Sequence, residues 1–204
     1  MSITYPLTFP NRPAPSRFSI EPASFSAMTQ SPWTASQQVQ LNQGQMWTIS
    51  VDYPPMNEND ARDWLSTLLA MRGQYGTVLF GNPRMRSPRG NWGSAPTVDG
   101  AGQTGQTLAV GGLPANAIIR AGDFFQIGED SSAKLHTVVQ DATANGSGAV
   151  TLDIWPRLRS MPTNGEALTT SNPRGLFRLA GPSISLQFEP FRYGLSLQLI
   201  EAVA

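Results

Sequence analysis

The chain has 204 residues and equal numbers of basic and acidic side chains, 14 of each, with 40% hydrophobic but only 14% charged residues. The balanced charge excludes a global field that would hold nucleic acid or an anionic membrane, and the absence of cysteine excludes disulfides, thiolate nucleophiles and Cys-ligated zinc. An average soluble domain carries about 25% charged residues, so a free monomer of this composition would be poorly protected against association. Composition therefore favours a component of an assembly over a free enzyme.

The first 15 residues contain four prolines and no apolar run. Proline fixes the backbone in extended conformations and removes a hydrogen-bond donor. We therefore expect this terminal segment to be extended and to lie on another surface. It fits neither a signal peptide nor a membrane span, and we expect the protein to be made in the cytosol and to stay there.

Several strands are predicted before residue 57. Residues 17–25 and 38–45 are typical of short strands, and residues 47–53 alternate between apolar and polar side chains in the pattern of a half-buried strand. We expect Pro54 and Pro55 to end this strand, because proline cannot donate to a sheet ladder.

Residues 57–73 predict one amphipathic helix. Asn57 is suited to cap its start and Gly73 to end it in a left-handed conformation. Residues 75–80 then alternate as a further strand that ends at Asn82 and Pro83. The apolar face of the helix is predicted to consist of Ala61, Trp64, Leu65, Leu68 and Leu69.

The sequence pattern changes between residues 84 and 172, where glycines separate short β-like runs and no helical period occurs. This spacing predicts a small β-barrel. After it, residues 184–188 and 193–199 again alternate, and they need partner strands because an isolated hairpin is marginal in water. We therefore predict a hub domain of residues 1–83 plus 173–204, interrupted by a barrel domain of residues 84–172. The barrel runs are residues 107–110, 124–127, 135–139 and 149–154.

Two motifs suggest chemistry at first sight. Residues 100–105 match the dinucleotide fingerprint G-x-G-x-x-G, but no helix can follow before Gly111, Gly112 and Pro114, so the segment is interpreted as a loop leading into the barrel. His136 is the only histidine, and Asp141 lies too close along the chain to orient it in a triad. We interpret His136 as a structural or surface residue.

The remaining candidates have structural interpretations as well. The carboxylates of Glu58, Asp60 and Asp63 fit the start of the helix, and those of Glu129 and Asp130 fit a turn. The sequence therefore predicts no catalytic, cofactor-binding or metal-binding residue and no enzyme. Among the tryptophans, Trp92 is the candidate for an exposed, sugar-stacking ring.

The order of these features resembles the distal tail proteins of long-tailed, non-contractile phages and of gene transfer agents. The resemblance covers nearly the whole chain. It is carried by residues 45–55 leading into the helix around Trp64, and by residues 72–77, 101–105, 121–127, 134–136, 154–158 and 175–179 with a final strand that ends at Glu201.

This resemblance implies a mainly β fold: a β-sandwich hub with one helix, interrupted by an OB-fold-like barrel. It also implies a structural virion protein that forms a hexameric ring between the tail tube and the distal tip or baseplate, with DNA only in transit. Residues 2–15 and loops of the hub sheet are the expected subunit contacts, and Gly122 and Asp123 are interpreted as turn residues. The alternative is a carbohydrate-binding tail accessory protein that uses the barrel around Trp92 and Gly100 for host attachment.

Overall fold

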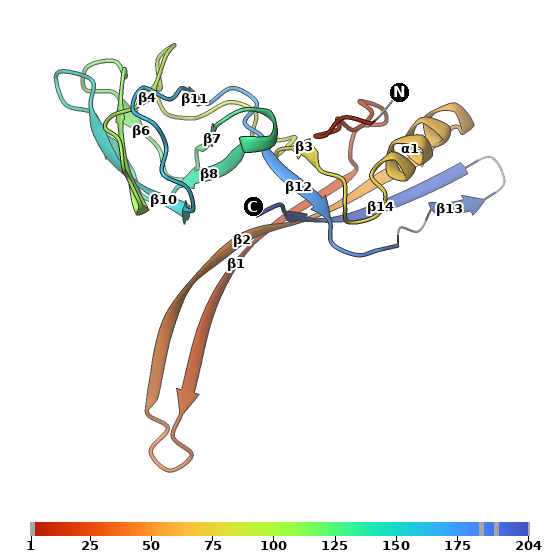
Figure 1. Ribbon diagram of the computed structural model, residues 1–204, viewed down its shortest axis with the longest axis horizontal. Coiled ribbons are helices and arrows are strands. Elements are labelled where there is room, and N and C mark those ends of the chain that lie inside the picture. Colours follow the sequence, from red (N-terminus) through yellow and green to blue (C-terminus); the bar gives the residue numbers. More distant parts are fainter. Residues whose placement is uncertain (1–2, 184–185, 190–191, 204) are drawn as a thin grey trace.

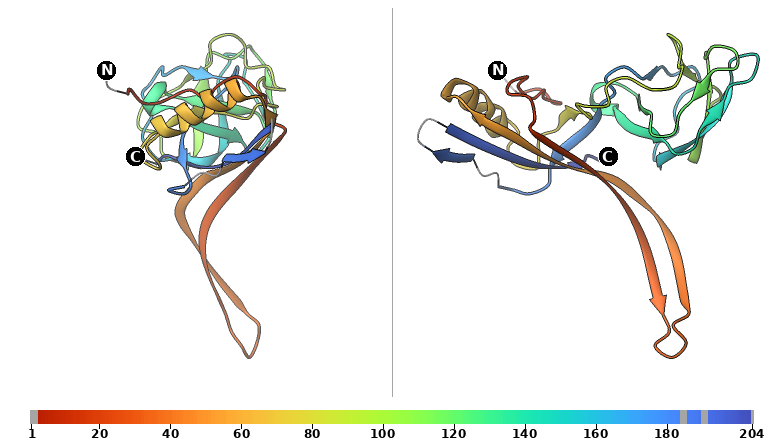
Figure 2. Two further views of the ribbon diagram at one scale, coloured as in Figure 1. Left: turned by 90° about the vertical axis from the view of Figure 1, so that its right-hand side faces the viewer. Right: turned by 180° about the vertical axis from the view of Figure 1, so that it is seen from behind.

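The computed structural model describes residues 3–183, 186–189 and 192–203 (Figure 1). The protein is mainly β, with a hub sheet, a separate barrel-like sheet and one α-helix among the described residues. A long β-hairpin projects from the hub, and the barrel lies at the opposite end from the helix (Figures 1 and 2). The predicted fold class of a β-rich protein with a small barrel is confirmed.

The hub sheet joins strands from both ends of the chain. Its order is β1-β2-β14-β12-β3, with β13 paired to the outer part of β14. The predicted pairing of C-terminal strands with strands before Asn82 is therefore present, because β14 pairs with β2 and β12 with β3. The domain limits of 1–83 plus 173–204 and 84–172 stay a prediction. Residues 184 and 185 of the predicted strand lie outside the described residues. The strands are β1 (Arg17–Gln30), β2 (Gln37–Met56), β3 (Val78–Phe80), β12 (Gly175–Leu179), β13 (Leu186–Glu189) and β14 (Arg192–Glu201).

The helix α1 (Glu58–Ala70) begins as predicted, because the side chain of Asn57 accepts a hydrogen bond from the Asp60 backbone N–H at 2.9 Å. It covers one face of the hub sheet (Figure 1). Trp64 is fully buried against Tyr53 of β2, with ring centroids 4.3 Å apart. The apolar face is narrower than predicted: Leu65 and Leu69 are 39% and 69% exposed, because the sheet covers only the side of the helix that carries Ala61, Trp64 and Leu68. No helix in the described part of the chain has the length and apolarity to cross a membrane.

Two leucines of this helix allow a matched test of its packing. Leu68 is 5% exposed and Leu69, one residue later, is 69% exposed. We expect Leu68→Ala to lower the free energy of unfolding by about 2–3 kcal/mol through lost burial and a residual cavity, and Leu69→Ala to leave it nearly unchanged. Urea unfolding followed by circular dichroism measures both. Equal effects of the two substitutions would contradict this packing.

The Pro-rich N-terminal segment lies on its own hub. Phe9 is buried, Leu7 forms a bridge with Val78 of β3, and the Tyr5 hydroxyl donates to the Ala70 carbonyl at 2.6 Å. The indole N–H of Trp64 donates to the Arg12 carbonyl at 2.9 Å. Within the described residues, the second layer of the predicted hub sandwich is thus this segment together with α1, and not another sheet.

The barrel is a nearly closed six-stranded sheet with the order β11-β7-β8-β10-β5-β4, accompanied by the short pair β6-β9. All four predicted β-like runs are strands here, and a separate apolar core fills the inside. The strands are β4 (Thr97–Val98), β5 (Gly105–Gly111), β6 (Ile118–Ile119), β7 (Phe124–Ile127), β8 (Lys134–Val138), β9 (Ala142–Thr143), β10 (Val150–Leu158) and β11 (Leu168–Thr169), with a 3-10 turn at Asp130–Ser132.

Three expectations about strand lengths are wrong. The two short strands predicted at residues 17–25 and 38–45 are parts of the continuous strands β1 and β2, and the strand predicted over 75–80 is formed only at Val78–Phe80. Strand β2 also runs through Pro54 and Pro55 to Met56. The prolines are tolerated because the pairing with β1 ends at Asp52 and the register with β14 shifts between Tyr53 and Met56, so no ladder donor is required there.

Candidate interaction surface on the projecting hairpin

The projecting part of the hairpin, residues 24–44, is here called the arm. Apart from the half-buried Ser31, every residue of the arm is exposed. No charged side chain occurs from Pro22 to Val51, a stretch that includes the whole arm. Soluble proteins commonly protect exposed strands with charges, especially lysine, so this arm lacks the usual protection against pairing with another chain.

The two faces of the arm differ in polarity. Cross-strand partners share a face, and the register pairs Ser26 with Leu41 and Met28 with Val39. Met28, Val39 and Leu41 are 60%, 60% and 69% exposed, so one face carries an uncovered apolar stripe. The other face carries the 53% exposed Phe25 at the hub end of the arm and the polar pair of Thr29 and Gln38 toward the tip. An apolar stripe of this kind on a projecting element is typical of a protein interaction surface.

Both edges of the arm are open for hydrogen bonding. Strand β1 is the terminal strand of the hub sheet, and β14 pairs with β2 only from Thr48 to Met56. The outer backbone groups of both arm strands therefore have no described sheet partner. Such edges are templates for adding a strand from another chain.

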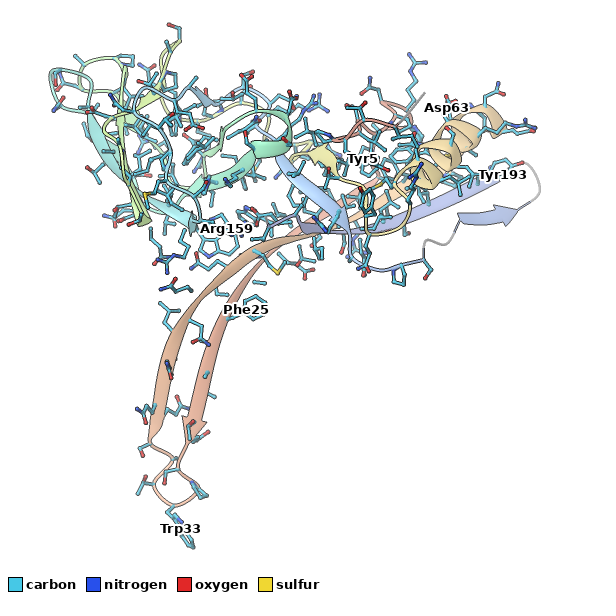
Figure 3. All side chains as sticks on the ribbon, in the orientation of Figure 1. Tyr5, Phe25, Trp33, Asp63, Arg159 and Tyr193 are labelled. Carbon is cyan, nitrogen blue, oxygen red and sulfur yellow. The ribbon has the colours of Figure 1, made fainter. Side chains whose placement is uncertain are left out.

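The tip of the arm presents one aromatic ring. The hydroxyl oxygen of Ser31 accepts from the backbone N–H groups of Trp33 and Thr34 at 3.3 and 3.4 Å, and the Ser31 N–H donates to the Ser36 carbonyl at 2.9 Å. These contacts hold the turn without using the indole, which is 93% exposed and points away from the body (Figure 3). The turn therefore displays Trp33 to a partner.

The root of the arm is fixed to the hub and the barrel at once. Arg159, just after β10, forms two 2.8 Å contacts with the Glu201 carboxylate, and it also donates to the Gln45 carbonyl. Glu201 in turn accepts from the Trp47 backbone N–H at 3.0 Å, and the Trp47 indole donates to the Leu135 carbonyl at 2.9 Å. This polar cluster sets the direction in which the arm leaves the body.

The predicted exposed aromatic was assigned to the wrong tryptophan. Trp92 is 2% exposed, packs on Phe125 and donates its indole N–H to the Asp123 carboxylate at 3.1 Å. It was predicted to be exposed because no periodic strand surrounds it, but a buried carboxylate holds it inside the barrel. A serine-rich turn flanking Trp33 was the available signal for an exposed ring.

The two turn interpretations agree with the structure. Gly122 has φ +83°, a conformation that favours glycine, and its backbone N–H donates to the Val138 carbonyl at 2.7 Å. Asp123 accepts hydrogen bonds from the backbone N–H groups of Arg89 and Gly90 at 2.7 and 2.8 Å. The glycine-rich segment 100–105 leads directly into β5, and no helix follows it, so the geometry of a dinucleotide site is not formed.

His136 is a buried residue of the barrel. It is 3% exposed, its ring stacks on Phe125, and its Nδ1 lies 2.9 Å from the Pro156 carbonyl. That carbonyl can only accept, so Nδ1 carries the proton and Nε2 is the unprotonated nitrogen. Burial lowers the pKa of His136 to about 4, and the charges of Arg159 and Lys134 act in the same direction. Within the described residues no group of three His, Asp or Glu side chains could hold a metal ion.

This lowered pKa predicts a loss of stability in mild acid. The unfolded chain takes up a proton near the ordinary histidine pKa of about 6.5, whereas the folded protein resists it down to about 4. The contribution of neutral His136 to the free energy of unfolding is therefore fully present above pH 6.5. It decreases as the pH falls from 6.5 to 4, by up to about 3 kcal/mol. Urea unfolding at pH 7.0 and 4.5 should show this decrease in the native chain and a much smaller one in His136→Gln. Equal pH dependence in both proteins would contradict it.

The acidic side chains considered as candidates in the sequence do not come together in one site. Glu58 pairs with Arg62 on the exposed surface of α1, and Asp141 pairs with Arg120 at the barrel surface. Hydrogen bonds from the Ala121 N–H and Arg120 lower the pKa of Asp141.

The comparisons with known proteins find no matching family model and no matching curated protein.

Proposed function

We propose that the chain is a structural virion protein of a phage tail tip, which forms a hexameric ring between the tail tube and the distal tip or baseplate. The observation that carries this proposal is the arm: 21 uncharged residues, all but Ser31 exposed, with an apolar stripe and two open strand edges. A free monomer would expose this surface to aggregation, whereas a ring of copies covers each arm with its neighbour. The resemblance to distal tail proteins supports the same assignment.

The open edges fit a cyclic assembly better than a two-fold dimer. The outer edge of β1 and the outer edge of β2 lie on opposite sides of one hairpin. An arm that contacts the body of the next copy leaves the arm of that copy free to contact a third, so addition continues until a rotation closes the ring. A closed ring leaves no arm without a neighbour.

The proposed partners follow from this role. They are further copies of the chain, the tail tube protein and the proteins of the tail tip, with DNA only passing through the central opening. The balanced charge supports transit without binding, because phosphate contacts from basic side chains are what hold DNA. The proposed location is the virion, after synthesis in the host cytoplasm, and the chain needs no catalytic residue or cofactor for this function.

Cryo-electron microscopy of tails that carry this chain tests the proposal. Six copies, about 132 kDa at 22.0 kDa each, are expected directly beneath the last ring of the tail tube. Each arm is expected to contact the neighbouring copy. Density for single copies on a fibre, or for a ring of another protein at this position, would overturn the proposal.

The alternative of a carbohydrate-binding protein relied on Trp92 as an exposed ring for sugar stacking. Trp92 is buried and cannot stack on a sugar.

A further inference from the structure

A cavity of about 180 Å³ lies on the hub, at its junction with the barrel. Pro10 and Pro13 of the N-terminal segment line this cavity, and so does Tyr53 of β2. Arg86 and Arg174 also line the cavity. We call this cavity the socket.

The socket has the chemistry that an aromatic ring requires. Proline and aromatic walls offer apolar contact, and a guanidinium group over the face of an indole is attracted by the ring electrons. Neither Arg86 nor Arg174 forms a salt bridge with any carboxylate in the described part of the chain. Arg86 donates from Nε to the Pro83 carbonyl at 3.1 Å, and the flat face of its guanidinium group is not used by this in-plane bond. A cavity of about 150 Å³ in a protein core holds a benzene ring, so the volume suits an inserted aromatic side chain.

The same chain presents a matching group at the tip of the arm. Trp33 is 93% exposed, while Trp47, Trp64 and Trp92 are buried. The tip carries no charge, so its insertion leaves no unpaired charge in the socket. Arginine and tryptophan are also the residues most enriched among energetic anchors of protein interfaces.

The positions of tip and socket exclude a contact within one copy and favour a directional contact between copies. The N-terminal wall of the socket lies on the helix side of the hub sheet, and the arm projects from the other side (Figures 1 and 2). A tip that enters the socket of the next copy therefore leaves its own socket free for a third copy. This head-to-tail arrangement produces a ring when its rotation closes.

We propose that Trp33 of each copy is seated in the socket of the neighbouring copy, between the N-terminal proline segment and the guanidinium groups of Arg86 and Arg174. This inference rests on the proposed ring and names the contact that joins its subunits. It also gives residues 2–15 a role in subunit contact as the wall of the socket, while they remain packed on their own hub.

Disulfide trapping tests the contact, because the native chain contains no cysteine. In the variant Thr34→Cys/Asn11→Cys, Trp33 is kept, one thiol is next to it at the tip and the other is at the exposed rim of the socket. Mild oxidation of the purified chain should give a ladder of covalent oligomers on a non-reducing gel. The matched control is Thr34→Cys/Thr104→Cys, whose second thiol lies in the exposed glycine-rich loop of the barrel and which should give at least tenfold less product. Both substituted pairs are exposed, so neither should impair folding.

The outcomes separate this inference from the proposed function. Equal yields from the two variants, or no product from either across a range of protein concentrations, would show that the tip does not enter the socket. A strong ladder from the first variant, together with tails that lack a six-fold ring of this chain, would keep the contact and overturn the tail-tip function. A six-fold ring in tails without the ladder would keep the function and overturn the contact.

Discussion

Replacing Glu201 by alanine is expected to lower the free energy of unfolding by about 3–5 kcal/mol. Its side chain is 4% exposed, and the partner Arg159 side chain is 18% exposed. The substitution leaves the guanidinium without its carboxylate and the Trp47 N–H without its acceptor, both in a poorly hydrated place. Urea unfolding followed by tryptophan fluorescence measures the loss.

Two further variants show that the effect belongs to the buried pair. The double variant Arg159→Met/Glu201→Leu removes both charges and should recover much of the loss, because no uncompensated charge stays buried. Arg62→Met breaks the exposed pair with Glu58, whose side chains are 73% and 61% exposed, and should cost about 0.5 kcal/mol or less. If Glu201→Ala were as mild as Arg62→Met, the cluster at the root of the arm would not stabilise the fold.

Asp123→Ala is expected to cost about 3–4 kcal/mol, although Asp123 lies in a turn and not in a strand. The carboxylate is 2% exposed, and it accepts from the backbone N–H groups of Arg89 and Gly90 and from the indole N–H of Trp92. Each buried donor that loses its acceptor is destabilising by about 1–3 kcal/mol. The loss should be accompanied by a change in the near-ultraviolet circular dichroism of the tryptophans.

The control for Asp123 is another aspartate that accepts a backbone hydrogen bond in the same barrel. Asp141 accepts from the Ala121 N–H at 2.7 Å, but its side chain is 52% exposed. Water can replace the lost acceptor there, so Asp141→Ala should be much milder than Asp123→Ala. A similar cost for both aspartates would mean that the loop from Arg89 to Trp92 does not depend on the buried carboxylate.

The sequence predicted the elements that bury an apolar face. Alternation identified the strand around Ile49, and the cap at Asn57 placed the start of the helix correctly. Both signals come from local burial and local hydrogen bonding, which leave a periodic trace in the sequence. The predicted β runs of the barrel were confirmed for the same reason.

The arm was only partly predictable from the sequence. Its exposure makes it available to a partner, but the same exposure removes the burial pattern on which strand prediction relies. Its side chains are exposed on both faces in a single copy, so residues 26–36 show no burial pattern, and the long hairpin was divided into two short strands. Trp33 was overlooked for a related reason, since neither burial nor periodicity marks a ring at a turn. The missing charge between Pro22 and Val51 was present in the sequence as an unbroken run.

The cluster at the root of the arm has a mechanical consequence. Gln45 accepts from the Arg157 N–H at 2.8 Å, and Arg159 and Glu201 tie the same point to the barrel and to the last hub strand. A load applied along the arm is therefore transmitted to the barrel through these contacts and not only along the backbone. If arms are locked together, the barrels should keep a fixed tilt, and averaged images of assembled copies should show them as sharply as the hub.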